Sequence, residues 1–262
     1  MGIFDQKKNN QFRIVARYVY YRVKSELTAE TARTYLSYVW WLLEPILTIA
    51  VFYVVFGMLF ERGGEGFVSF LLLGVTAWFW FQHSISKSVT SIRKEARLMS
   101  QVYVPKYTFP LCAVTFMLFK HLFVVLVLVG MLLVIETPSV TWFFYPLIFL
   151  VQLILILALS VLVAAIVPFI PDLTLVVPPL LRLSLFLSGV FYSQEMIPAG
   201  YVHYFRYNPL AGLIMEYRKV MLYGQMPDFV YLIKIVLISS LILAFGLWLL
   251  AKLDRIYPRL NN

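Results

Sequence analysis

The sequence predicts an all-α membrane protein with six transmembrane helices, and three observations support this fold class. Hydrophobic residues make up 61% of the 262-residue chain and charged residues only 13%, against about 45–50% and about 25% in soluble domains. Six apolar windows each approach the roughly 20 residues that a helix needs to cross a hydrocarbon core. Lipid offers no partner to an unpaired backbone group, so windows of this length must be helical. The expected spans are Val39–Phe60, Phe67–Ser86, Phe109–Ile135, Trp142–Val167, Leu175–Tyr192 and Val230–Leu250.

The distribution of basic residues predicts the topology of the chain. We expect a cytoplasmic N-terminal segment, residues 1–38, followed by one membrane domain, residues 39–262. With the N-terminus in the cytoplasm, Lys and Arg gather before the first span, between the second and third, and after the sixth, as the positive-inside rule requires. Both termini are then cytoplasmic. The net charge of +9 reflects topology and anionic lipid rather than a nucleic-acid partner.

The N-terminal segment is predicted to contain an amphipathic interfacial helix. Between residues 11 and 27, apolar side chains recur at intervals of three and four residues while basic side chains share another face. One interpretation is simple anchoring in the membrane surface. The other is that the planar guanidinium groups of Arg13, Arg17 and Arg22 bind the phosphate of a lipid substrate at its entrance.

A second cytoplasmic segment, residues 87–106, is expected to form a short charged helix that ends before Pro105. It is either a solvated loop helix or the surface on which a motor protein pushes. The coupling candidates are Arg93, Lys94, Glu95 and Arg97. The chain has no G-x-x-x-x-G-K-[ST] loop to hold ATP phosphates. We therefore expect a non-enzymatic chain that cannot hydrolyse ATP by itself. An ATP-driven process would then need a separate ATPase to bind ATP and Mg.

Charged and aromatic residues within the spans supply the candidates for a substrate path. Arg182 is expected near mid-membrane if its helix continues past Pro178-Pro179, and a charge there faces a cavity or another helix. Aromatic residues either form belts at the membrane edges or stack on sugar rings along the path. The path candidates are Trp40, Trp41, Phe52, Tyr53, Phe56, Arg182, Phe191 and Tyr192.

The outer segment before the last span, residues 193–228, is too long for a tight turn and too apolar for a solvated loop. We expect short helices that rest on or re-enter the outer leaflet. Asn208 is the expected N-cap of one of them, Pro209 its first helical residue and Gly224 its stop. Irregular backbone at membrane depth requires burial in protein or a cavity.

Several other functional classes fit the sequence less well. Cys112 is the only cysteine, so neither a disulfide framework nor a thiolate metal site is expected. A membrane-embedded sugar transferase would need paired carboxylates or a His/Asp cluster, but Asp172, Glu195 and the three histidines are scattered. An ion-coupled carrier or channel would need facing charges or a Gly-rich filter, and Arg182 has no obvious acidic partner in the sequence.

Four sequence blocks resemble the membrane subunits of ABC type-2 exporters that move polysaccharides across the bacterial inner membrane. The blocks are TYLSYVWWLLEPILTIAVFYVVFG (34–57), VYVPKYTFPL (102–111), LSGVFYSQEMIP (187–198) and YNPLAGLIMEYR (207–218). They occur in the order and spacing of that family. The first block, with Glu44-Pro45 after paired tryptophans, is more similar to the O-antigen and capsule exporters than to drug exporters.

The resemblance implies a half-transporter that pairs with a second copy of itself and with two copies of an ATPase. Its implied substrate is an undecaprenyl-pyrophosphate-linked glycan, O-antigen above all, with capsular and teichoic-acid-type polymers as alternatives. The N-terminal helix would flank the substrate entrance, residues 87–106 would dock on the ATPase, and the outer helices would close the exit. An ion-coupled carrier or channel stays as a more distant alternative.

Overall fold

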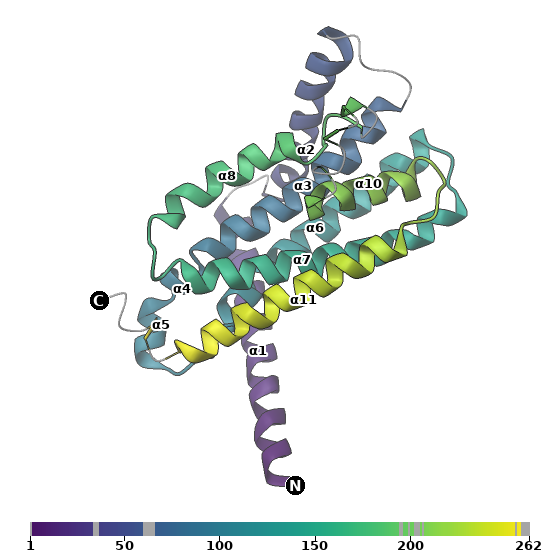
Figure 1. The fold of residues 1–262 in the computed structure, drawn as a ribbon. Coiled ribbons are helices and arrows are strands. Elements are labelled where there is room, and N and C mark those ends of the chain that lie inside the picture. The colour runs from purple at the N-terminus through teal and green to yellow at the C-terminus, as the bar shows by residue number, and fades with distance from the viewer. Residues whose placement is uncertain are drawn as a thin grey trace.

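The protein is described by a computed structural model that covers residues 2–33, 37–59, 66–193, 196–198, 200–201, 205, 207–254 and 256–257. All regular structure in these ranges is helical, which confirms the all-α prediction. Figure 1 shows an elongated helical bundle from which the first helix, α1 (Gly2–Arg33), projects with the N-terminus at its far end.

Four helices within the described ranges are long and apolar enough to cross a membrane. They are α3 (Phe67–Val89), α6 (Thr108–Ile135), α7 (Tyr145–Ile166) with the preceding 3-10 turn η2 (Val140–Phe144), and α11 (Phe229–Lys252). They match the second, third, fourth and sixth expected spans closely at both ends. Hydrophobic length therefore predicted these four elements well.

The first and fifth expected spans take less regular forms. Helix α2 (Ser37–Phe52) continues directly into a π-helical segment, η1 (Tyr53–Leu59). Helix α8 (Leu173–Leu187) has 15 residues, about 22 Å at 1.5 Å per residue, which is shorter than a hydrocarbon core of about 30 Å. It runs through Pro178 and Pro179 without a break. The fifth apolar helix thus ends before the expected Tyr192.

Gly189 explains where α8 stops. Its φ of +65° lies in the left-handed region, which favours glycine because that residue has no Cβ. A Cβ at this position would also lie 2.4 Å from the Phe205 ring. The left-handed backbone at Gly189 turns the chain out of the helix, and the Phe205 ring leaves no room for a side chain there.

The centre of the bundle is α3, which contacts α2, α6, α7, α8 and α10 (Pro209–Met221). Leu71 and Val75 are fully buried there. Buried Gln152 of α7 donates a 2.7 Å hydrogen bond to the carbonyl of Ala77 on α3. Apolar packing and this polar contact together fix α7 against the central helix.

The outer segment contains α10, and its local signals act as predicted. The Asn208 side chain accepts hydrogen bonds from the backbone amides of Leu210 and Ala211, and Pro209 is the first helical residue. Most of α10 is buried, packed against α3 and α7. The chain leaves α10 through Gly224, whose φ is +60°. Asp228 then caps α11 by accepting from the amide of Tyr231.

Helix α1 uses its apolar stripe to contact the bundle. Val15, Val19 and Val23 are buried against Cys112 and Phe116 of α6. The spacing predicted the helix and its apolar face correctly. Its position in the membrane surface stays a prediction.

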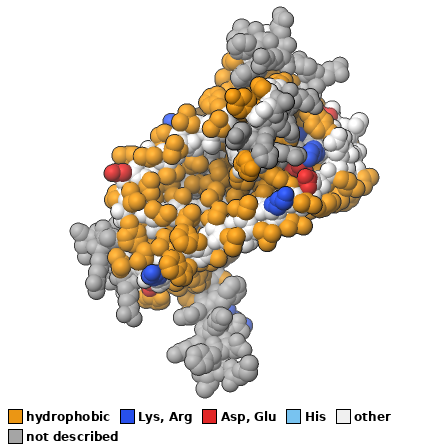
Figure 2. All heavy atoms as spheres, in the orientation of Figure 1, with side chains coloured by type: hydrophobic (Ala, Val, Ile, Leu, Met, Phe, Trp, Pro, Cys, Tyr) orange, Lys and Arg blue, Asp and Glu red, His pale blue; other side chains and the backbone are white. Residues whose placement is uncertain are grey.

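The outer surface of the bundle is strongly apolar. Figure 2 shows hydrophobic side chains over most of the coloured surface, with few charged groups among them. On α8 and α11 the exposed residues include Leu175, Leu183 and Leu241. A surface of this kind is suited to lipid or to another apolar protein surface.

Candidate functional site

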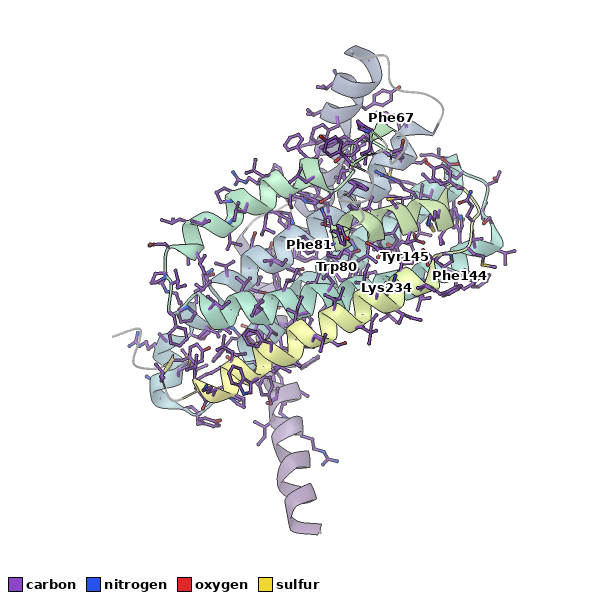
Figure 3. All side chains as sticks on the ribbon, viewed as in Figure 1. Phe67, Trp80, Phe81, Phe144, Tyr145 and Lys234 are labelled. Carbon is purple, nitrogen blue, oxygen red and sulfur yellow. The ribbon has the colours of Figure 1, made fainter. Side chains whose placement is uncertain are left out.

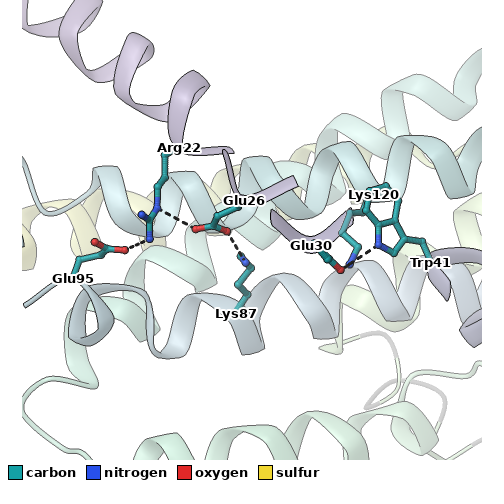
Figure 4. Close-up of polar contacts among 7 residues, drawn as sticks. All are labelled: Arg22, Glu26, Glu30, Trp41, Lys87, Glu95 and Lys120. Carbon is teal, nitrogen blue, oxygen red and sulfur yellow. Dashed lines mark hydrogen bonds and ion pairs between the residues drawn. The ribbon is translucent and has the colours of Figure 1, made fainter. Parts of the chain in front are cut away.

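Residues 87–106, the predicted coupling unit, are joined to α1 through ion pairs (Figure 4). After α3 ends at Val89, the chain makes two short helices, α4 (Ser91–Lys94) and α5 (Ala96–Gln101). Between them, Glu95 accepts a hydrogen bond from Arg22 of α1. Arg22 also pairs with Glu26 at 3.2 Å. Glu26 reaches Lys87 of α3 at 2.8 Å, so three elements share one charge network.

The four coupling candidates separate into two groups in this unit. Arg93, Lys94 and Arg97 are exposed, whereas Glu95 is half-buried against α1. The three basic side chains therefore face outward, where a partner protein would meet them. Glu95 instead connects the segment to α1.

The three entrance candidates on α1 also differ from one another. Arg13 and Arg17 are exposed, so their guanidinium groups are accessible to an anionic ligand. Arg22 is partly buried and already bonded to two carboxylates. Arg13 and Arg17 are therefore the better placed of the three for binding a phosphate group.

Several of the aromatic path candidates come together where α2 meets the end of α8. The ring centroids of Phe52 and Phe191 are 4.0 Å apart, and Phe186 of α8 lies 5.7 Å from Phe191. The Tyr192 hydroxyl donates to the carbonyl of Phe186 at 2.9 Å. Tyr53 begins η1 and is partly buried. The side chain of Phe56 lies outside the described residues.

Arg182 stands on the exposed face of α8, a helix that contributes no buried residue. The helix is continuous across Pro178-Pro179, which keeps Arg182 within an apolar segment. A charge that faces lipid at such a place is costly, so it is expected to face a cavity or a partner helix.

Trp40 and Trp41 lie at the start of α2, close to the end of α1. Trp40 is exposed, while the Trp41 indole donates to Glu30 of α1 at 3.2 Å. Lys120 of α6 pairs with Glu30 at 2.7 Å and lies 4.8 Å from the centroid of the Trp41 ring. Figure 4 shows these three side chains together. Trp41 is thus part of a polar and aromatic cluster.

A family comparison decides the class of the protein. The model of the ABC-2 type transporter family matches residues 23–222, which include the predicted coupling unit (residues 87–106), the rings of Phe52 and Phe191, and α10. The chain belongs to the ABC-2 type transporter family. A member of this family is the membrane-spanning component that works with an ABC ATPase.

Curated relatives of this ABC-2 transporter share one name. A protein of Klebsiella pneumoniae named O-antigen export system permease protein RfbA is 28% identical over 73% of this chain and 74% of its own length. A protein of Myxococcus xanthus with the same name is 26% identical over 84% of this chain and 86% of its own length. The similarity therefore covers most of each chain.

Sequence reasoning about this ABC-2 transporter missed a buried arginine. Arg218, the last residue of the block YNPLAGLIMEYR and not among the candidate site residues, is buried in α10. Its guanidinium group donates to the carbonyls of Gly189 at 2.7 Å, Val190 at 2.8 Å and Phe70 at 3.1 Å. It also lies 3.3 Å from the centroid of the Phe70 ring. Arg218 reaches these partners because α10 is buried. The burial of α10 depends on packing between distant segments, which the local sequence does not specify.

The His, Cys, Asp and Glu side chains of the described ranges are not arranged as a metal centre. No group of three His, Cys, Asp or Glu side chains in them is placed to hold a metal ion. The arrangement that is present consists of exposed cations, an ion-paired linkage and stacked rings. Such groups can bind, orient and guide a ligand.

Proposed function

We propose that this ABC-2 transporter chain is the permease subunit of an ATP-driven exporter that moves lipid-linked O-antigen across the bacterial inner membrane. The observation that carries the proposal is its similarity, over most of both chains, to permeases named for O-antigen export. Those names favour O-antigen over capsular or teichoic-acid-type polymers. The aromatic rings at α2 and α8 suit a repetitive sugar chain, because ring faces stack on the apolar C–H faces of sugars.

The exposed face of α8 supports pairing with a second copy of the chain. Leu175 and Leu183 are 75% and 59% exposed, and Arg182 lies on the same helix. Lipid would accept the leucines but not the charge. A second copy facing α8 would cover the leucines and leave Arg182 beside a shared path for the glycan.

Transport in this proposal begins at the cytoplasmic side. The lipid pyrophosphate is held by exposed Arg13 and Arg17, whose guanidinium groups match phosphate oxygens. The partner ATPase binds ATP and Mg, closes, and pushes on exposed Arg93, Lys94 and Arg97. The glycan then moves between the two copies along Phe52, Tyr53 and the rings near α8, where each contact is weak enough to release.

Purification of the chain, combined with deletion of its gene, tests the main proposal. The tagged chain is purified from its native membranes in mild detergent, and bound proteins are identified by mass spectrometry. An ATPase with a phosphate-binding loop in near-equimolar amount is expected, together with loss of surface O-antigen when the gene is deleted. Purification without any ATPase, along with normal O-antigen in the deletion strain, would instead favour a carrier or channel.

Cysteine crosslinking tests the pairing of two copies. In a Cys112→Ser background, which removes the single native cysteine, Leu183→Cys on α8 is expected to give a disulfide-linked dimer. Leu241→Cys on α11 is an equally apolar control with 72% exposure, and it is expected to give no disulfide-linked dimer. Crosslinking at Leu241 but not at Leu183 would place the second copy on α11.

A further inference from the structure

A cavity of about 300 Å³ lies between α1, α2, α3 and α6. Its volume is at the lower end of the range of small-molecule sites. The lining includes Glu30 of α1, Trp41 and Glu44 of α2, Trp80 and His83 of α3, and Lys120 of α6.

Aromatic rings form much of the cavity wall and are held in place by stacking. Trp80, labelled in Figure 3, stacks on His121 with ring centroids 4.4 Å apart. The imidazole of His83 stacks on Phe79 at 5.2 Å. Trp41 is fixed by its hydrogen bond to Glu30. Phe149 covers the other face of Trp80 with ring centroids 4.5 Å apart, so Trp80 closes the wall. Trp41 offers a ring whose orientation is already set before a ligand binds.

Polar groups converge on the same space. The Glu44 carboxylate lies 3.4 Å from the Nε2 atom of His83, and the Lys120 ammonium lies 2.7 Å from Glu30. Carboxylates accept hydrogen bonds, an ammonium donates them, and an imidazole does either. The cavity therefore presents both donors and acceptors beside aromatic faces.

The charge balance indicates which ligand suits the cavity. Two carboxylates face one ammonium and the two imidazoles of His83 and His121, so with neutral imidazoles the lining carries no excess of positive charge. A phosphate group would lie beside Glu30 and Glu44, and like charges repel at this range. A neutral molecule with several hydroxyl groups meets no such penalty. This contrasts with the exposed arginines of α1, which suit an anion.

We propose that this cavity binds one neutral sugar residue of the exported glycan, with an apolar sugar face against Trp41 and hydroxyls bonded to Glu44, His83 and Lys120. The inference rests on the proposed function and adds a sugar site within one copy of the chain. The site selects the sugar, while the α1 arginines bind the pyrophosphate.

A binding experiment tests the site directly. Methyl glycosides of glucose, galactose, mannose and N-acetylglucosamine are titrated singly into the full-length chain in lipid nanodiscs while tryptophan fluorescence is recorded. At least one is expected to give a saturable change that inorganic pyrophosphate does not reverse. Glu44→Gln and His83→Gln are expected to raise the apparent Kd at least tenfold. Glu136→Gln, a carboxylate change at the end of α6 and outside the cavity lining, is expected to leave it unchanged.

An export experiment in cells separates the site from the proposed function. Glu44→Gln is expected to lower surface glycan at least fivefold at normal expression and thermal stability, whereas Trp41→Phe, which keeps a ring, is expected to lower it less than Trp41→Ala. If the unaltered chain exports glycan and Glu44→Gln neither weakens glycoside binding nor lowers export, the site is wrong and the exporter stands. If the unaltered chain exports no glycan but saturates with a glycoside, the exporter is wrong and the sugar site stands.

Discussion

Arg22 of α1 donates a hydrogen bond to Glu95, the residue between the two short helices of the coupling unit. The pair connects residues 73 positions apart in the chain. It joins a helix expected at the substrate entrance to a segment expected to dock on the ATPase. The pair is therefore a contact through which movement of one element would reach the other.

A double-mutant cycle tests whether this pair transmits movement. Arg22→Ala and Glu95→Ala are each expected to lower export and ATPase stimulation, because each removes the linkage. The double variant is expected to lose no more than the worse single variant, since residues in one ion pair are not additive. Transport and ATP hydrolysis are measured in proteoliposomes. Losses that add fully in the double variant would show that the two residues act independently.

The proposed phosphate binding by α1 predicts that two substitutions at Arg17 lower the amount of surface glycan to different extents. Arg17→Ala is expected to lower surface glycan several-fold, and Arg17→Lys to restore it only in part, because an ammonium lacks the bidentate fork of a guanidinium. Quantitative staining of surface glycan measures both. Full activity of Arg17→Ala at normal expression would show that Arg17 does not bind the lipid pyrophosphate at the entrance.

We expect the exposed basic residues of the predicted coupling unit to contribute to binding of the ATPase. The double change Arg93→Glu with Lys94→Glu is expected to reduce the amount of copurified ATPase several-fold by reversing two outward charges. Lys252→Glu near the end of α11 is the control and is expected to retain the ATPase. Equal ATPase recovery from all samples would place the docking surface elsewhere.

We expect substitution of Arg218 to lower the stability of the folded protein strongly. Arg218→Leu would leave the carbonyls of Phe70, Gly189 and Val190 without their donor, and an unsatisfied buried group costs about 1–3 kcal/mol. We expect a loss of roughly 3 kcal/mol or more, visible as a lower Tm of the detergent-solubilised protein. Lys234→Leu, an exposed change on α11, is the control. An unchanged Tm for Arg218→Leu would mean that water or other donors replace the guanidinium.

Local signals in the sequence determined most of the helical elements. Apolar length predicted α3, α6, α7 and α11, because burial of backbone groups in lipid leaves the helix as the only solution for such windows. Asn208 and Pro209 predicted the start of α10, since capping depends only on neighbouring residues. The spacing of Val15, Val19 and Val23 likewise predicted the face of α1 that packs on α6.

Tertiary structure decided which side chains meet. Glu95 was predicted as a coupling residue and Arg22 as an entrance residue, but only the packing of α1 brings them into one ion pair. Arg218 gained its role because α10 folds back against α3 and the end of α8. The cavity beside Trp41 also requires four helices at once. Contacts between distant segments depend on the relative positions of whole helices, which the periodicity of a single helix does not specify.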